Sequence, residues 1–204
     1  MGKQRIIAIS REYGSGGHQV AREVAAALEL PLYDKNLLEE IARQKSVDVK
    51  QLEKYDEHPK HHLLSRRVKG YSNSPQEVIA QMQFDYLRNL AGEGKSFVVL
   101  GRCGEYVLKD YEGLVSIFIL ADETDKTASV AQRENVSLKE ADVLRKRTDL
   151  KRKMYHNNHC PQKWGDARNY DLTINSSRLG LERTTKLILQ YLDDLQEYRC
   201  GQLR

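Results

Sequence analysis

The sequence Gly-Ser-Gly-Gly at residues 14–17 stands between a predicted strand and a predicted helix. The β-branched run over residues 5–10 is typical of a strand buried on both faces. Residues 19–28 carry one apolar stripe of an amphipathic helix. A glycine-rich turn between two such elements exposes several backbone N–H groups and directs a helix N-terminus at one point. Such a turn binds anions, and phosphate is its usual ligand.

The turn matches the standard phosphate-binding loop only in part. That motif reads Gly, four residues, Gly, Lys, then Ser or Thr. With Gly16 as the second glycine, Arg11 stands at the first, Gly17 at the lysine and His18 at the hydroxyl position. The lysine that reaches the β- and γ-phosphates is therefore missing. Either Arg11 or Arg22 supplies the charge, or the segment is a tight turn without a ligand.

Size and composition indicate one compact α/β domain over residues 1–204. Charged residues make up 30% of the chain and hydrophobic residues 40%. We expect a soluble cytoplasmic protein, because no apolar run approaches the ~20 residues that span a bilayer and the N-terminus lacks the apolar segment of a signal peptide. The three cysteines, Cys103, Cys160 and Cys200, are widely spaced and odd in number, which favours a reducing compartment over a disulfide framework.

Two polar stretches allow more than one interpretation. Residues 145–153 hold six basic residues in nine, which indicates either a solvated helix face or an arm that contacts phosphate. Residues 46–73 contain His58, His61 and His62 and are expected to move. A metal site there would lack a cysteine or a close carboxylate pair, so we expect exposed or partner-facing histidines.

The remaining pattern alternates strands with helices. We expect strands over residues 5–10, 31–34, 96–100, 114–121 and 172–175, and helices over residues 19–28, 36–45, 75–91, 123–135, 137–157 and 181–195. This order predicts a parallel sheet covered on both faces. Ligands of such sheets bind beyond the carboxyl ends of the strands. Residues 11–17, Asp34, residues 101–102 and residues 121–122 should meet at that edge.

Several motifs together resemble the cytidylate-kinase-like family of bacteria, a branch related to the nucleoside monophosphate kinases. They are Arg-Glu-Tyr-Gly-Ser-Gly-Gly at 11–17, Tyr33-Asp34, Gly101-Arg102, Lys-Trp-Gly-Asp at 163–166 and Asn-Tyr-Asp-Leu at 169–172. The resemblance implies a three-layer, P-loop NTPase-like fold: a five-stranded parallel sheet with helices on both faces and a helical lid. The lid would span about residues 137–170, and residues 46–73 would form a mobile insert on the acceptor side.

The resemblance also implies an activity, with ATP and Mg²⁺ as cofactors. The ATP γ-phosphoryl group would pass to a nucleoside monophosphate, with CMP or dCMP as the best candidate, although Cys103 replaces an Asp of that family. The implied cofactor-binding residues are Tyr13, Gly14, Ser15, Gly16, Gly17, His18 and Gln19. Arg11, Arg145 and Arg152 would act on the transferred group, and Asp34 and Arg102 on the acceptor. Magnesium would bind mainly to phosphate oxygens and water, helped by one carboxylate, Asp34 or Asp122.

Three classes of function follow from these features. The first is a phosphotransferase of the nucleoside monophosphate kinase type, acting on a small-molecule nucleotide. The second is a nucleotide-binding regulatory protein that keeps the fold and has little or no turnover, as the missing lysine would suggest. The third, nucleic-acid binding through residues 145–153, is the least favoured. We expect no membrane partner, and the sequence leaves a homo-oligomer open.

Overall fold

The computed structural model describes residues 4–34, 36–45, 67–68, 71–72 and 75–201. The predicted insert at 46–73, including its three histidines, falls almost entirely outside the described residues. Within it, two short strands pair antiparallel: β3 (Arg67–Val68) and β4 (Tyr71–Ser72). None of the helices in the described ranges is both long and apolar enough to cross a membrane.

A five-stranded parallel sheet forms the centre of the fold, which confirms the predicted architecture. Its strand order is β2-β5-β1-β6-β7. The strands are β1 (Ile6–Arg11), β2 (Leu32–Tyr33), β5 (Phe97–Leu100), β6 (Leu114–Leu120) and β7 (Leu172–Asn175). Each lies within one residue or two of its predicted bounds. The central strand β1 ends at the glycine-rich loop, so the loop follows the middle of the sheet.

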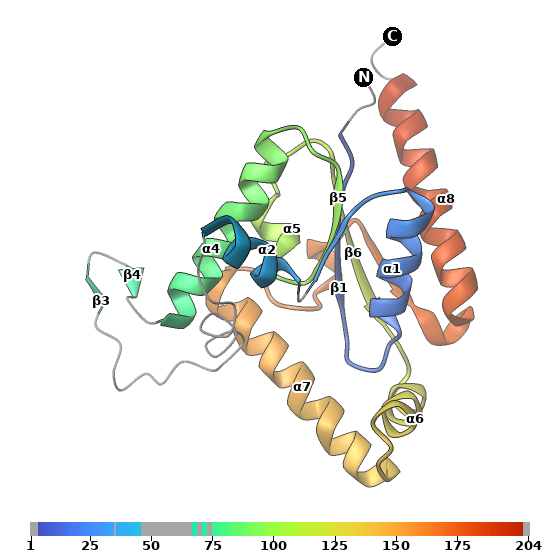
Figure 1. The fold of residues 1–204 in the computed structure, drawn as a ribbon. Coiled ribbons are helices and arrows are strands. Elements are labelled where there is room, and N and C mark those ends of the chain that lie inside the picture. The colour runs from blue at the N-terminus through green and yellow to red at the C-terminus, as the bar shows by residue number, and fades with distance from the viewer. Residues whose placement is uncertain (1–3, 35, 46–66, 69–70, 73–74, 202–204) are drawn as a thin grey trace.

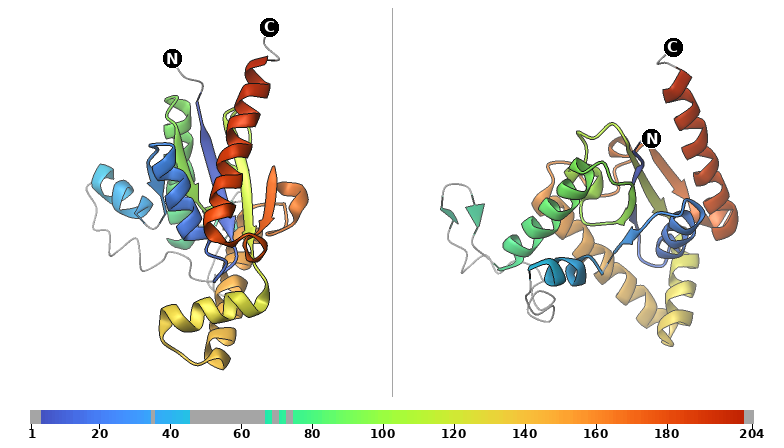
Figure 2. Two further views of the ribbon diagram at one scale, coloured as in Figure 1. Left: turned by 90° about the vertical axis from the view of Figure 1, so that its right-hand side faces the viewer. Right: turned by 45° about the horizontal axis from the view of Figure 1, so that its top comes forward.

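Helices cover both faces of the sheet (Figures 1 and 2). On one side, α1 (Gly17–Ala27) and α8 (Gly180–Gly201) pack against Ile7 and Ile9 of β1. On the other, α2 (Leu37–Lys45), α4 (Pro75–Gly92) and α5 (Gly104–Val107) pack against Ile6 and Ala8. The side chains of β1 alternate between the two cores, as the period of a strand requires. The short helix α5 was not predicted.

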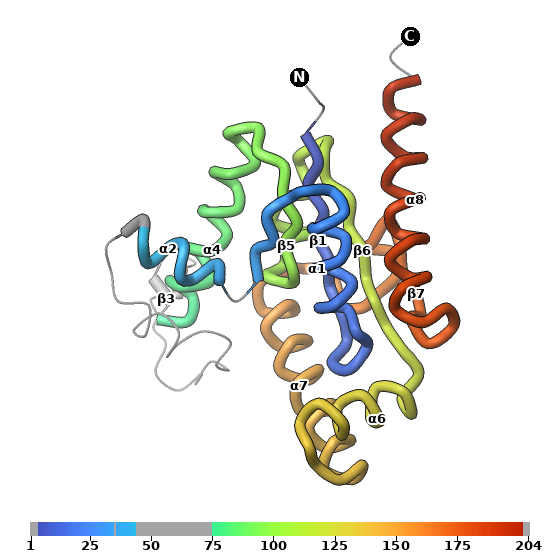
Figure 3. Tube along the Cα trace, turned by 45° about the vertical axis from the view of Figure 1, so that its right-hand side comes forward, coloured from blue at the N-terminus to red at the C-terminus, as the bar shows by residue number. Residues whose placement is uncertain are grey.

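Two further helices lie across the end of β1 (Figures 1 and 3). These are α6 (Glu123–Glu134) and α7 (Leu138–His159), which pack on each other. A capping box starts α7: the Ser137 hydroxyl accepts from the Glu140 N–H, and the Glu140 carboxylate accepts from the Ser137 N–H. Short 3₁₀ turns follow at Ala167–Asn169 and Ser176–Arg178. Helix α7 thus lies over the loop that the sequence singled out.

A cavity of about 30 Å³ lies at the opposite, amino-terminal edge of the sheet. Ile7, Leu28, Val115 and Leu192 are among the residues that line it. Because one water molecule needs about 10–15 Å³ of such volume, this space is far too small for a nucleotide. The functional site must be sought at the other edge, beside the glycine-rich loop.

Candidate active site at the glycine-rich loop

The loop needs glycine at two positions for two independent reasons. Gly14 and Gly16 have φ values of +89° and +74°, a region that other residues adopt only under strain. A Cβ on Gly14 would also lie 2.6 Å from the carbonyl oxygen of Lys126, and one on Gly16 would overlap the side chain of Leu181. The loop is therefore held closely between α6 and the first turn of α8.

Hydrogen bonds fix the same loop from within and from β7. The Ser15 hydroxyl donates to the carbonyl oxygen of Glu12 at 2.9 Å. The buried Ser176 hydroxyl lies 2.8 Å from the Ser15 carbonyl oxygen and 3.1 Å from that of Leu120. Ser176 directly follows β7, so the end of this strand helps to hold the loop in place.

The two departures from the standard loop motif lie against each other. A Cβ on Gly17 would be 2.5 Å from the Cβ of Arg11, so the stem of Arg11 fills the space that a side chain at position 17 would need. The Nη1 atom of Arg11 lies only 2.6 Å from where a Cβ on Gly101 would stand. The arginine therefore runs from the end of β1 to the end of β5, across the ligand edge of the sheet.

Arg152 and Asp149 bring α7 onto the loop. Arg152 donates from Nη1 to the carbonyl oxygen of Arg11 at 3.1 Å. The Tyr13 N–H donates to Oδ1 of Asp149 at 2.7 Å, a length typical of a charge-assisted bond. An N–H group of the loop thus already donates to a carboxylate oxygen, which shows that this part of the backbone can bind an anionic oxygen. Sequence reasoning did not foresee the contact between Asp149 and Tyr13, because 136 residues separate the two.

The pKa of Asp149 makes this contact sensitive to pH. Burial raises that pKa to about 6, against the opposing effect of the Tyr13 N–H. Between about pH 4 and 6 the folded chain therefore binds more protons at this group than the unfolded chain, so its contribution to stability falls as pH rises. Asp149→Asn keeps an acceptor for Tyr13 without a charge. We expect the variant to gain about 1–2 kcal/mol relative to wild type between pH 4 and 7, by urea unfolding.

Asp142 on the same helix is a control of opposite sign for this prediction. The Lys146 ammonium lowers the pKa of Asp142, so Asp142→Asn should lose stability relative to wild type as pH rises. A stability difference between wild type and Asp149→Asn that stays constant from pH 4 to 7 would contradict the assignment.

Tyr13 lies between two arginines rather than in open space. Its ring is 4.5 Å from the guanidinium carbon of Arg133 and 5.4 Å from that of Arg152. Its hydroxyl donates to Oε1 of Glu134 at 2.8 Å. These contacts pack Tyr13 against α6 and α7, and its contact with a nucleotide stays a prediction.

A lysine that the motif did not predict also reaches the loop. Lys126 on α6 is buried, and its Nζ lies 2.7 Å from Oε2 of Glu12. The same carboxylate oxygen lies 3.4 Å from the Ala121 N–H. The signal that could have found Lys126 is its place in the first turn of a helix that follows a strand end at the ligand edge.

Comparisons with known proteins identify the family of the chain. The model of the cytidylate kinase-like family matches residues 6–178. The chain belongs to the cytidylate kinase-like family. Curated cytidylate kinases from Pyrobaculum islandicum and Pyrobaculum aerophilum are 26% identical to it, over 92% and 91% of both chains respectively.

Solved structures extend the likeness to the kinase fold. An uncharacterized protein from Eubacterium ventriosum is 38% identical, with a TM-score of 0.74 over 93% of this chain and 99% of its own. A shikimate kinase from Bacteroides thetaiotaomicron and a gluconokinase from Sinorhizobium meliloti are 12% and 13% identical, with TM-scores of 0.53 and 0.54. The first covers 93% of this chain and 98% of its own, and the second covers all of both. These two show the fold alone, which is that of P-loop kinases.

Within this kinase-like chain, Arg145 does not lie free beside the loop. The side chain is buried; its Nη2 lies 3.0 Å from Glu123 and 2.6 Å from Asp142, and its Nε donates to the Thr127 hydroxyl at 2.9 Å. The guanidinium therefore ties α7 to α6. Its expected contact with the transferred group stays a prediction.

The start of α1 meets the residue predicted to bind the acceptor. Nε2 of His18 lies 2.9 Å from Oδ2 of Asp34. Oδ1 of Asp34 also accepts from the Asn36 N–H at 3.2 Å, so this carboxylate supports the entry to α2 as well. The Gln19 side chain bonds instead to Glu23 within α1. Of the two arginines proposed to supply the missing charge, Arg22 is exposed on α1 and Arg11 lies at the loop.

The turn after β5 is strained. Three successive residues, Gly101, Arg102 and Cys103, have φ values of +78°, +57° and +53°. For a residue with a side chain this region costs on the order of 1–2 kcal/mol. Arg102 is 7% exposed and follows the strand end beside Arg11. Strain of this kind gathers at functional sites, which supports the predicted role of this turn without assigning a contact to Arg102.

The residues present suit a phosphate group and a magnesium ion to different degrees. The loop N–H that holds Asp149 could hold a phosphate oxygen instead, and Arg11 and Arg152 supply cations beside it. Of the two carboxylates considered for Mg²⁺, Asp122 accepts from Asn175 at 2.8 Å and pairs with Arg178. Asp34 is bound to His18. Either would have to exchange a partner for the ion, which fits an ion held mainly by phosphate oxygens.

Proposed function

We propose that this chain transfers the γ-phosphoryl group of ATP to a nucleoside monophosphate, with CMP or dCMP as the preferred acceptor. The observation that carries the proposal is the loop after β1, where a backbone N–H binds an anionic oxygen and Arg11 crosses the strand ends. Membership of the cytidylate kinase-like family supports the nucleotide class. The names of the curated relatives support CMP over other acceptors.

The chain would contribute positioning and charge rather than covalent chemistry. Bound ATP with Mg²⁺ supplies the phosphoryl group and part of the charge that neutralises it. Backbone amides over residues 13–19 would orient the phosphates. Arg11 and Arg152 would neutralise the migrating group, since a planar guanidinium makes bidentate contacts with phosphate. Helices α6 and α7 lie over the loop and would exclude water from it (Figure 3).

Asp149 would have to leave its place when phosphate arrives. Its carboxylate and a phosphate oxygen compete for the Tyr13 N–H, and two anions on one amide repel each other. Arg152 lies 3.7 Å from Asp149, so it is placed to keep the displaced carboxylate or to follow the phosphate. We infer that nucleotide binding shifts α7 relative to the loop.

A second function is favoured by two specific observations. Gly17 replaces the lysine of the standard motif, and Asp149 fills part of the anion site. A regulatory protein that binds nucleotide without turnover would have the same features. It would respond to nucleotide in binding experiments and give no product.

A phosphoryl-transfer assay with ATP and Mg²⁺, run across all common ribo- and deoxymonophosphates, tests the proposal. We expect product with CMP or dCMP at a rate well above that with AMP, GMP or UMP. Thermal unfolding gives an independent readout of binding. Nucleotide at 100 times its Kd contributes about 2.7 kcal/mol, which corresponds to a rise in Tm of roughly 5–10 °C for a domain of this size.

The two readouts separate the possible outcomes. A rise in Tm with no product from any monophosphate would favour the regulatory function. Product with a different acceptor would support the phosphotransferase activity and show that CMP is not the preferred acceptor. No rise in Tm at millimolar ATP with Mg²⁺ would contradict both functions.

A further inference from the structure

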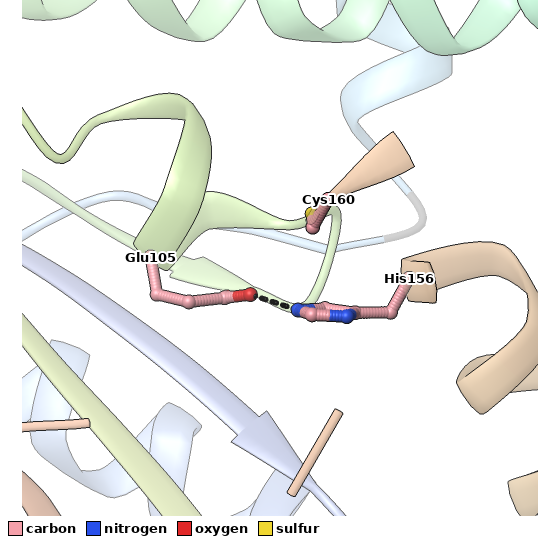
Figure 4. A group of neighbouring side chains, drawn as sticks. All are labelled: Glu105, His156 and Cys160. Atoms are coloured by element: carbon pink, nitrogen blue, oxygen red, sulfur yellow. Dashed lines mark hydrogen bonds and ion pairs between the residues drawn. The ribbon is translucent and has the colours of Figure 1, made fainter. Parts of the chain in front are cut away.

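Three side chains with metal-ligand chemistry meet where α5 touches the end of α7, and a fourth, Cys103, lies beside one of them. Glu105, His156 and Cys160 are buried, and one donor atom from each lies within 4.8 Å of the other two. Figure 4 shows Glu105 and His156 end to end, with Cys160 beside them. Nε2 of His156 lies 2.6 Å from Oε1 of Glu105. Cys103 is also buried, and its thiol lies close enough to that of Cys160 for the two groups to affect each other's pKa.

The backbone places these groups together from two elements. His156 and Cys160 are four residues apart at the end of α7, so they lie on one face of the helix, one turn apart. Cys103 and Glu105 come from the strained turn into α5, where Cys103 itself has a φ of +53°. A cysteine in this conformation costs folding free energy, so we expect its side chain to have a stabilising or functional role.

Neighbouring groups orient the imidazole and the carboxylate. Nδ1 of His156 lies 3.3 Å from the side-chain oxygen of Asn157, which leaves Nε2 for a ligand. The second oxygen of Glu105 accepts from the Ser10 hydroxyl at 3.4 Å. Metal-binding histidines characteristically give their other ring N–H to an oxygen, and ligating carboxylates are hydrogen-bonded in turn.

We propose that Cys103, Glu105, His156 and Cys160 form a tetrahedral site for a zinc-class divalent metal ion. Two sulfurs, one imidazole nitrogen and one carboxylate oxygen suit zinc and disfavour magnesium or calcium, which prefer oxygen ligands. Binding would release the two thiol protons and the proton shared by His156 and Glu105 to solvent, and would form four metal–ligand bonds. The site uses none of the groups assigned to phosphate binding.

Among Glu105, His156 and Cys160 the distances permit such a site with small movements, and Cys103 would have to approach these three ligands to complete it. In tetrahedral zinc sites the ligand atoms lie roughly 3.4–3.8 Å apart, given metal–ligand bonds of about 2.0–2.3 Å. The pair formed by His156 and Glu105 would open from 2.6 Å by about 0.8 Å, and Cys160 would close from within 4.8 Å by about 1 Å. The ion would replace a proton at the centre of the cluster.

A simpler interpretation is a buried ion pair packed against two small apolar thiols. A buried pair of this kind joins α7 to α5 without a metal, but its desolvation offsets much of the attraction between the charges. It gives no role to the strained Cys103. The metal site accounts for all four side chains and would fix α7 one turn beyond Arg152, the residue that contacts the loop.

Cobalt substitution tests the proposal in the full chain. The purified protein is stripped with a chelator under reducing conditions and titrated with Co²⁺ as the probe, then with Zn²⁺ in competition. We expect one equivalent of Co²⁺ to give the intense visible bands of a tetrahedral site and a near-ultraviolet thiolate-to-metal charge-transfer band. Zinc should displace it and raise the Tm of the stripped protein.

Variants separate the assigned ligands from the remaining thiol. Cys103→Ser and Cys160→Ser should each reduce the charge-transfer band by about half and weaken binding on the order of 100-fold. Cys200→Ser is the matched control, because Cys200 is exposed on α8, and it should bind Co²⁺ as wild type does. Where a variant unfolds, zinc content and the cobalt spectrum of the wild-type protein still decide.

Three results would overturn the site. The first is a weak octahedral cobalt spectrum without a thiolate band in the wild-type protein. The second is a band lost in Cys200→Ser and retained in Cys160→Ser. The third is mild peroxide converting the reduced wild-type protein to a Cys103–Cys160 disulfide in the presence of one equivalent of Zn²⁺, because zinc-bound thiolates would be protected.

Discussion

Arg11→Ala is expected to lower kcat for phosphoryl transfer roughly 10²–10³-fold while changing the Kd for ATP by less than about tenfold. The reason is its position: the side chain crosses from the end of β1 to Gly101 at the end of β5, where the transferred group would lie. A cation aimed at developing charge acts mainly in the transition state, so its loss appears in kcat. Steady-state kinetics and equilibrium binding of ATP measure the two effects separately.

Arg22→Ala is the matched control for this prediction. Arg22 is an exposed arginine on α1, close in sequence to the loop, and its removal also lowers the net charge by one. We expect its kcat to stay within about twofold of wild type, as for a surface charge without a partner in the reaction. Equal losses in kcat and ATP affinity in Arg11→Ala would make Arg11 a residue that binds ground state and transition state alike.

The sequence predicted most of the framework because that framework depends on local signals. Strand β5 is a continuous apolar run, β1 and β6 are mostly apolar, and the side chains of Ser137 and Glu140 mark the start of α7. Alternation of strands and helices then leaves few topologies open. The glycine-rich loop was found for the same reason: its conformation needs residues without a Cβ, and the need is visible in the residue types.

The groups around the loop could not be predicted in the same way. Lys126 meets Glu12, and Asp149 meets Tyr13, across more than 100 residues of chain, and no periodicity encodes such contacts. Arg145 shows the converse limit. Its basic stretch suggested a phosphate contact, yet the side chain is buried against Glu123 and Asp142. Charge in a sequence indicates a partner of opposite sign without saying whether that partner is a ligand or a neighbouring helix.

The two unusual loop residues, Arg11 and Gly17, form a single unit in the structure, and this pairing makes a second strong prediction. Gly17→Lys alone restores the lysine of the standard motif but places a Cβ 2.5 Å from that of Arg11. We expect it to destabilise the fold by about 1–3 kcal/mol, as overpacking does, and to lose most of the activity. Arg11→Gly removes the obstructing stem and, together with Gly17→Lys, completes the glycine and lysine positions of the motif.

The double variant should therefore recover what each single change loses. We expect a coupling free energy of about 1–3 kcal/mol in a double-mutant cycle followed by urea unfolding. The kcat of Arg11→Gly with Gly17→Lys should exceed that of Arg11→Ala at least about tenfold, because the lysine would return a cation to the phosphates. Gly201→Lys is the control for adding a lysine, since a Cβ there meets no atom within 4 Å. Strictly additive free energies of unfolding in the cycle would show that Arg11 and Gly17 depart from the motif independently. In that case Arg11 would not be a replacement for the missing lysine.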